Sequence, residues 1–326
     1  MNLRQAVHEF ISNLELTDGE RDDASRQHKN LRDGLAQKLE LDPDFNTFLT
    51  GSYARSTAIR PLKDIDVFCV LKCTDKFDEI QLAPAKALAT IKSALQSIYN
   101  GKVAEPQRRS MNIEFSGTGI AYDVVPAFID EEAKKVDEEV FFIPDVDQSQ
   151  WIRSNPRVHK RKSVAANENA GSELKPLTKA IKHWNRRQPE NDQLRSFHIE
   201  VMAWAVLTEK PENRLEGLKM LFMGLASRVL SSTPDPAGLG PNIDDGMTLA
   251  DRYAARDRLN QAASTMADAI QSANDGKTEA AHHKLYGLFG DPYPEKGKAE
   301  PEAAPKVTVA AVALPTATDA NKSRFG

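Results

Sequence analysis

The sequence predicts an α/β protein in which a small, mixed, twisted sheet is followed by an all-helical lobe. Short β-branched and aromatic runs, which favour strands, occur between residues 64 and 126. A helical period over residues 84–98 separates two of these runs, so the order is strand, helix, strand. Amphipathic helical periods then dominate residues 173–288.

The composition limits the class of partner. The chain has 326 residues, a formal net charge of −4 and 28% charged residues. This balance lacks the basic footprint of a protein that holds long nucleic acid, whereas small nucleotides remain suitable partners. Cys69 and Cys73 are too few for a disulfide framework, and no His or Cys pair has zinc spacing. Since no stretch has the length of a membrane span and no signal peptide is evident, we expect a cytoplasmic protein without membrane association.

Two helices are expected ahead of the first strand. Apolar residues recur at helical spacing over residues 3–16 and again over residues 31–39. Asp42-Pro43-Asp44 breaks the second helix, and residues 45–49 suit a strand that leads to Gly51.

Residues 50–71 are the stretch around which the chain is organised. Val67 to Leu71 is an apolar run typical of a buried strand. Because side chains alternate along a strand, Asp64 and Asp66 project from the same face, roughly 7 Å apart. Two such carboxylates repel each other and lose hydration unless positive charge lies between them. Mg²⁺, with Mn²⁺ as an alternative, meets this need because it binds carboxylates together with phosphate oxygens.

Gly51 and Ser52 open this stretch. A glycine lets the backbone approach a phosphate closely, and the N–H groups at a helix start favour anions. Alone, a Gly-Ser pair is most often a turn, and two acids separated by one residue are most often a solvated loop. Their coincidence with a buried strand favours a phosphate-binding turn followed by a metal-binding strand.

The order G-S-x-x-x-x-T-x-[IL]-x-P-x-x-D-[IV]-D-[IVL] over residues 51–67 resembles the signature of the DNA-polymerase-β-like nucleotidyltransferases. Within them it is most similar to the bacterial relatives of cyclic GMP-AMP synthase and oligoadenylate synthase, the CD-NTases of antiphage signalling systems. The family often has Gly where this chain has Ser56. The resemblance implies a polymerase-β-like fold, two Mg²⁺ ions and a third acid on a neighbouring strand.

Asp123 is the candidate for that third acid. Residues 101–126 predict three strands, with a hairpin at Gly117-Thr118-Gly119. Asp123 interrupts the last of these, where an unpaired carboxylate is costly. On its own it could equally be a buried acid that caps a neighbouring backbone. Beside Asp64 and Asp66, and given the resemblance, it is predicted to be a metal ligand.

Residues 130–175 are first acidic and then basic, and we expect them to cross from the sheet lobe to the helical lobe along one side of the cleft. The basic cluster is either a phosphate contact or a solvated face. Its members are Arg153, Arg157, His159, Lys160, Arg161 and Lys162.

Two residues of the helical lobe are assigned by resemblance. Lys182-His183-Trp184 matches a Lys-x-Trp pair whose Lys holds the nucleotide's phosphates in the family, although composition alone makes Lys182 a surface lysine. Residues 195–200 resemble the family's Ser-[FY]-x-[IL]-Glu, which implies a phosphate contact for Ser196. Ser196 is also a good N-cap in its own right.

The predicted division is a catalytic lobe with N-terminal helices (1–165), a helical lobe that closes the cleft (166–294) and a disordered tail (295–326). The tail has too few large apolar residues to offset its chain entropy. Some operons of the resembling family encode a ubiquitin-activating-like enzyme that conjugates the synthase through its C-terminus. Gly326 is therefore a candidate attachment point, with an ordinary solvated tail as the alternative.

The expected function is a metal-dependent nucleotidyltransferase that makes a cyclic di- or trinucleotide second messenger for an effector in antiphage defence. A ribose hydroxyl attacks the α-phosphate of a nucleoside triphosphate, ATP foremost, and releases pyrophosphate. One alternative is a nucleotidyltransferase that modifies tRNA or protein, which the charge and the two full lobes disfavour. Another is an inactive nucleotide-binding module, which the presence of all three acids disfavours. The site residues are Asp64, Asp66 and Asp123 for the metal and Gly51, Ser52, Lys182 and Ser196 for the triphosphate.

Overall fold

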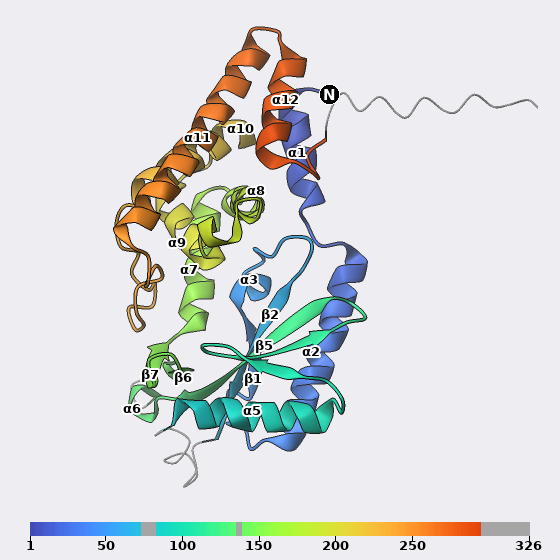
Figure 1. Cartoon of the computed structure of the whole chain (residues 1–326), viewed down its shortest axis with the longest axis vertical. Coiled ribbons are helices and arrows are strands. Elements are labelled where there is room, and N and C mark those ends of the chain that lie inside the picture. The colour runs from blue at the N-terminus through green and yellow to red at the C-terminus, as the bar shows by residue number, and fades with distance from the viewer. Residues whose placement is uncertain (73–82, 135–138, 295–326) are drawn as a thin grey trace, which may run out of the picture.

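The computed structural model describes residues 1–72, 83–134 and 139–294. The molecule is elongated, with a sheet lobe at one end and a helical lobe at the other (Figure 1). The helix α7 (Pro156–Asn169) leads from the sheet lobe into the helical lobe. The predicted fold class, a small mixed sheet plus a helical lobe, is confirmed.

Within the described residues the sheet has seven strands, of which five form a continuous path in the order β1-β2-β5-β4-β3. β2 and β5 pair in parallel, and the other pairs are antiparallel. β6 and β7 form a hairpin that continues from the far end of β5. The strands are β1 (Thr47–Thr50), β2 (Asp64–Val70), β3 (Ala104–Pro106), β4 (Met111–Phe115), β5 (Ile120–Ile129), β6 (Phe141–Asp145) and β7 (Gln150–Ser154).

One face of the sheet is covered by α2 (Asp18–Lys38) and α5 (Pro84–Ile98). Ile65 and Val67 of β2 belong to the apolar core on this side, together with side chains of both helices. Because side chains alternate along a strand, Asp64 and Asp66 project from the opposite face, which looks toward the helical lobe. The pairing of the sheet with its helices thus decides which face carries the acids.

The helical lobe has one continuous core to which helices from both ends of the described chain contribute. Its helices are α1 (Leu3–Asn13), α8 (Leu174–Arg186), α9 (Ser196–Val206), α10 (Arg214–Arg228), α11 (Leu249–Asn274) and α12 (Thr278–Phe289), with a short 3-10 turn at Glu190–Asp192. Two further short helices, α3 (Gly51–Ala54) and α6 (Glu131–Lys134), lie in the sheet lobe.

The position of α1 differs from the expected division. The sequence groups both N-terminal helices with the sheet lobe, but Phe10 of α1 lies 4.6 Å from Phe289 of α12 between ring centroids and shares the core of the helical lobe. A helical period shows that a face is buried, but it does not show against which lobe. In Figure 1, α1 accordingly lies beside α12, and α2 runs down to the sheet.

Two further elements differ from the expectations. α2 begins at Asp18, well before its apolar period, because Thr17 and Glu20 form a capping box. The hairpin of β6 and β7 lies within residues 130–175, where the sequence predicts only a crossing segment. β6 does carry an apolar run, Phe141-Phe142-Ile143, which could have indicated a strand, whereas β7 includes the polar residues Gln150, Arg153 and Ser154 and gives a weaker signal.

Some expectations fall outside the described residues. Cys73 and the segment 295–326 with Gly326 are among these, so the predicted disorder and conjugation of the tail stay predictions. Cys69 is a buried free thiol. Among the described helices, none combines the length and apolar character that a bilayer crossing requires.

Candidate active site

A row of four polar side chains crosses the sheet on the face opposite α2 and α5. In the strand register, Thr50 of β1 pairs with Asp66 of β2, Asp66 with Asp123 of β5, and Asp123 with Asn112 of β4. Residues paired in this way project from the same face of a sheet. Asn112 Nδ2 donates a hydrogen bond of 2.8 Å to Asp123 Oδ1. The third acid therefore lies on the strand beside the first two, as the sequence predicts.

The acids have too little positive charge around them. Asp66 is half-buried, and its desolvation, together with the carboxylates of Asp64 and Asp123, raises the pKa of Asp66 to about 7, with Arg55 acting in the opposite direction. Burial also raises the pKa of Asp123, although the Asn112 hydrogen bond offsets part of this and Asp64 adds to it. A raised carboxyl pKa means that the ionised form is disfavoured, so a bound cation would stabilise this arrangement.

The carboxylates of Asp64, Asp66 and Asp123 are the type of ligand that a hard divalent cation binds. Carboxylate oxygens are the ligands that Mg²⁺ prefers, and it keeps positions for water and phosphate oxygens. Within the described ranges, no three His, Cys, Asp or Glu side chains already form a group that could hold a metal ion. The carboxylates of Asp64, Asp66 and Asp123 would therefore have to turn toward a common point to bind one.

Gly51 is required by its contact with Asp66. Its φ is +64°, and a Cβ added there would lie 1.6 Å from Asp66 Oδ2. Both the left-handed backbone and the missing side chain are thus needed for α3 to lie against the acid. The glycine allows a close approach, as the sequence predicts, but in this structure the approaching group is a carboxylate of the protein itself.

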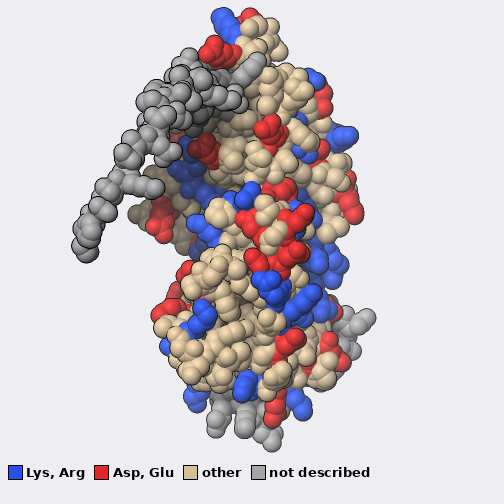
Figure 2. Space-filling view, turned by 90° about the vertical axis from the view of Figure 1, so that its right-hand side faces the viewer, with Lys and Arg blue, Asp and Glu red and all other residues tan. Residues whose placement is uncertain are grey.

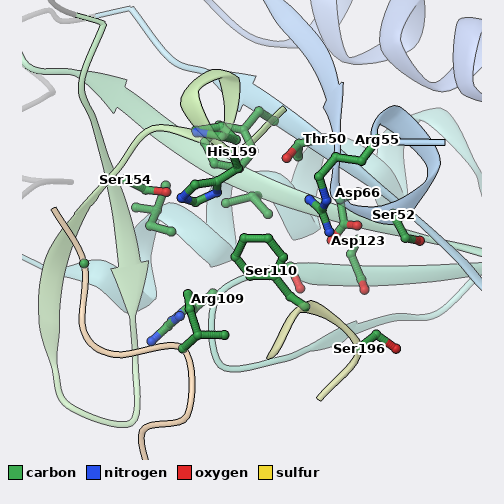
Figure 3. Close-up of a pocket in the computed structure, with 18 of the residues that line it drawn as sticks. Thr50, Ser52, Arg55, Asp66, Arg109, Ser110, Asp123, Ser154, His159 and Ser196 are labelled. Atoms are coloured by element: carbon green, nitrogen blue, oxygen red, sulfur yellow. The ribbon is translucent and has the colours of Figure 1, made fainter. Parts of the chain in front are cut away.

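A cavity of about 420 Å³ lies above the acids. All seven residues that the sequence assigns to the site line it: Gly51, Ser52, Asp64, Asp66, Asp123, Lys182 and Ser196. Figure 3 shows Asp66, Asp123 and Arg55 directed toward one another on one side, with Ser154 and His159 on the other. The two lobes thus contribute jointly to one cavity.

Lys182 is not the surface residue that composition suggests. Its side chain is 2% exposed, and Nζ donates hydrogen bonds to the Thr57 carbonyl (2.9 Å) and to Glu200 Oε1 (3.0 Å). Burial lowers the pKa of Lys182, and Glu200 counteracts this. Its ammonium group therefore lies in the wall of the cavity, already bonded to protein groups.

Ser196 lies at the start of α9 but does not cap it. Arg195 occupies the N-cap position, and no side chain makes a capping hydrogen bond there. The N-cap expected at Ser196 is therefore off by one residue, and the Arg195 guanidinium is bonded instead to Asp245 and to the Ile243 carbonyl. The Ser196 side chain is left to line the cavity.

Much of the basic cluster is engaged in ion pairs. Arg153 pairs with Asp130 at 2.9 Å, and His159 Nε2 lies 2.6 Å from Asp235 Oδ1. Arg153 and His159 line the cavity, so the crossing segment does run along its side. Arg153, Arg157 and His159 are thus paired with acids, whereas Lys160, Arg161 and Lys162 are exposed, as a solvated face would be.

Two residues that sequence reasoning missed occupy the back of the cavity. Arg55 Nε donates to Glu200 Oε2 at 2.8 Å, which joins the segment after α3 to α9 of the other lobe. Glu200 is the only acid in α9, a helix otherwise rich in apolar residues. An isolated acid in an apolar element is the signal that identified Asp123, and it could have identified Glu200. Arg55 carries no comparable signal in its local sequence.

These features together define a class. A mixed sheet with acids on adjacent parallel strands, facing a helical lobe across a polar cavity, is the architecture of the polymerase-β-like nucleotidyltransferases. The fold matches solved structures of this class. The structure of CdnC from Escherichia coli MS115-1 with ATP superposes with a TM-score of 0.70 at 21% identity, over 90% of this chain and 99% of that one. The cyclic AMP-GMP synthase DncV of Vibrio cholerae superposes with the same score at 15% identity, over 90% and 98%.

The family follows from the sequence comparisons. The model of the Second Messenger Oligonucleotide or Dinucleotide Synthetase domain matches residues 1–167, and the chain belongs to this family, the CD-NTases. A cyclic AMP-AMP-AMP synthase from an Acinetobacter species is 26% identical over 88% of this chain and 85% of its own length. A probable cyclic AMP-AMP-GMP nucleotide synthase from Salmonella paratyphi B is 25% identical over 91% and 94%. The protein is thus a nucleotidyltransferase of the class that makes cyclic oligonucleotide second messengers.

Proposed function

We propose that this protein joins nucleoside triphosphates, ATP foremost, into a cyclic di- or trinucleotide that acts through an effector in antiphage defence. The observation that carries the proposal is the pair of acids at Asp66 and Asp123, which lie opposite each other and face a cavity shared by both lobes. The names of the relatives support a cyclic product, and ATP accompanies the structure of CdnC.

Asp64, Asp66 and Asp123 would hold two Mg²⁺ ions, or Mn²⁺ in their place. Bound there, the ions supply Lewis-acid stabilisation of the attacking ribose oxygen and of the departing pyrophosphate. The residues' own task is to hold carboxylate oxygens on one face of the sheet. Asn112 donates a hydrogen bond to Asp123 Oδ1 and so limits the orientations open to that carboxylate.

Gly51, Ser52, Lys182 and Ser196 form the proposed triphosphate site. The Ser52 and Ser196 side chains line the cavity from opposite lobes, so a nucleotide between them would contact both. Lys182 adds positive charge from within the wall. Fixed donors of this kind lower the cost of reorganising the site as charge develops on the phosphate.

The surface gives little support to a long nucleic acid as substrate. On the face that Figure 2 displays, Lys and Arg side chains gather near the waist between the lobes, with acidic side chains interspersed. The net charge of −4 agrees with this pattern.

Incubation with triphosphates labelled at the α-phosphate tests the proposal against its alternatives. We expect label in a small soluble product that resists phosphatase, because a ring has no terminal phosphate. Label in acid-precipitated tRNA or protein would instead indicate a modifying enzyme. Label that stays entirely in triphosphate, although the protein binds it, would indicate an inactive binding module.

A further inference from the structure

Glu200 is the centre of a buried polar network that joins the two lobes. Its carboxylate is 0% exposed and accepts hydrogen bonds from Arg55 Nε (2.8 Å), Thr57 Oγ1 (2.9 Å) and Lys182 Nζ (3.0 Å). Although burial by itself raises the pKa of Glu200, Arg55 and Lys182 lower it to about 2. Glu200 is therefore ionised in the folded protein at neutral pH.

Two cations share this one carboxylate, so the network carries an excess of positive charge at the cavity wall. Lys182 does not present this excess positive charge to a ligand, because its Nζ is buried and already bonded to Thr57 and Glu200. Arg55, in contrast, uses only Nε in the network. Among the described residues, neither of its terminal nitrogens has a hydrogen-bond partner, and neither is a fully buried unsatisfied atom.

The Arg55 side chain is held firmly while its terminal nitrogens remain open to the cavity. The guanidinium lies 4.5 Å from the centroid of the Phe197 ring and lines the cavity. Figure 3 shows it directed toward Asp66 and Asp123. A planar guanidinium that is fixed at Nε and lies over a ring still has its two terminal nitrogens, and one N–H of each points in the same direction, which suits bidentate binding of a phosphate.

We propose that Arg55 is a substrate-contacting residue that binds the polyphosphate of the nucleotide, and that Glu200, Lys182 and Phe197 are positioning residues that hold it. The inference rests on the proposed function and adds a residue that neither the sequence signature nor the comparisons assign. It also separates the roles of two cations in the proposed triphosphate site: Arg55 contacts the phosphates directly, whereas Lys182 adds positive charge from the wall and helps to hold Glu200 in place.

A purely structural role for Arg55, as a clamp between the lobes, is the competing account. The two accounts predict different effects of an Arg55 substitution on the affinity for different nucleotides. A phosphate contact affects a triphosphate much more than a monophosphate, whereas loosening of the clamp affects both alike. Arg256 of α11 offers a matched control outside the cavity, because it also pairs with an acid, Asp257, and lies 4.8 Å from the centroid of an aromatic ring, Tyr253.

The experiment measures the affinity of the full chain for α,β-methylene-ATP and for AMP with Mg²⁺, by calorimetry. The methylene group prevents loss of pyrophosphate, so binding is measured without turnover. For Arg55→Met we expect affinity for the triphosphate analogue to fall by about 10- to 100-fold, while affinity for AMP changes by less than about threefold. Arg55→Lys, which keeps the charge but loses the fork, should be intermediate. Arg256→Met should match the wild type.

Equal losses for both nucleotides, or no loss, in both Arg55 variants would overturn the assignment. Urea unfolding of each variant checks the fold. If Arg55→Met is unfolded, the affinities measured for Arg55→Lys decide between the two accounts. Suppose that the wild-type chain makes cyclic product and that the Arg55 variants still bind the triphosphate analogue in preference to AMP, as the wild type does. Only the role assigned to Arg55 would then be wrong. If the wild-type chain neither binds the analogue nor makes product, the proposed function falls with it.

Discussion

Asp66 and Asp123 lie directly opposite each other on the parallel strands β2 and β5, and both line the cavity between the lobes. Their pairing places two carboxylates on one face of the sheet with Arg55 as a nearby cation. This is an unfavourable arrangement for the free protein unless a cation or substrate makes use of it.

Replacing Asp64 and Asp66 together by Asn should abolish product formation without destabilising the protein. The double variant removes two carboxylates that repel each other at a site where desolvation, together with Asp64 and Asp123, raises the pKa of Asp66 to about 7. Its urea midpoint should equal or exceed that of the wild type. Near-normal product, or loss of activity only through unfolding, would contradict the metal assignment.

Asp123→Asn should reduce turnover by at least about 100-fold, because charge stabilisation of the transition state is lost while the side chain keeps its size. Glu114→Gln is the matched control, since Glu114 lies on the neighbouring strand β4 but is exposed. Steady-state rates of pyrophosphate release measure both. Activity of Asp123→Asn within tenfold of the control would return Asp123 to a structural role.

Gly51→Ala should inactivate the enzyme by displacing Asp66. A methyl group at this position would lie 1.6 Å from Asp66 Oδ2. Gly119→Ala separates this effect from backbone strain, because Gly119 has a similar φ of +68° with no atom within 4 Å of an added Cβ. Strain alone should cost about 1 kcal/mol of unfolding free energy in each variant. Equal activity of the two alanine variants would show that the contact with Asp66 is unimportant.

Glu200→Gln should destabilise the protein by about 3–5 kcal/mol at pH 7, since Arg55 and Lys182 lose their buried counter-charge. The pKa of Glu200 is lowered from 4.5 to about 2, so its stabilising contribution is complete above pH 4.5 and is lost as the pH falls toward 2. Urea midpoints between pH 7 and pH 3 should therefore show the gap between wild type and variant narrowing on acidification. A gap that is absent at pH 7, or that widens at low pH, would contradict this account.

The fold class, and the placing of Asp64, Asp66 and Asp123 on neighbouring strands, could be predicted because their signals are local. Asp64 and Asp66 stand at the head of an apolar strand, and Asp123 interrupts another, so each position conflicts with its surroundings. A charged residue in an apolar strand can be recognised in the sequence without knowing which residue it contacts. The structure pairs the two strands in parallel, in a register that brings Asp66 and Asp123 opposite each other.

The lobe to which α1 belongs and the pairing of Arg55 could not be predicted in this way. An amphipathic helix such as α1 can bury its face against either lobe, and only contacts with distant residues, such as those of Phe10 with α8 and α12, decide between them. Arg55 is an ordinary charged residue in its local sequence, and its role depends on Glu200, which is 145 positions away. Such contacts between distant residues have no signature in either segment alone.

The mass of the product made from ATP with Mg²⁺ tests the central claim most directly. The account predicts that wild-type protein yields a phosphatase-resistant species whose mass corresponds to a closed ring of two or three nucleotides, with one pyrophosphate released for each nucleotide incorporated. The Asp64→Asn, Asp66→Asn double variant should yield none. Only linear products that retain a triphosphate, or the same ring from the double variant, would contradict it.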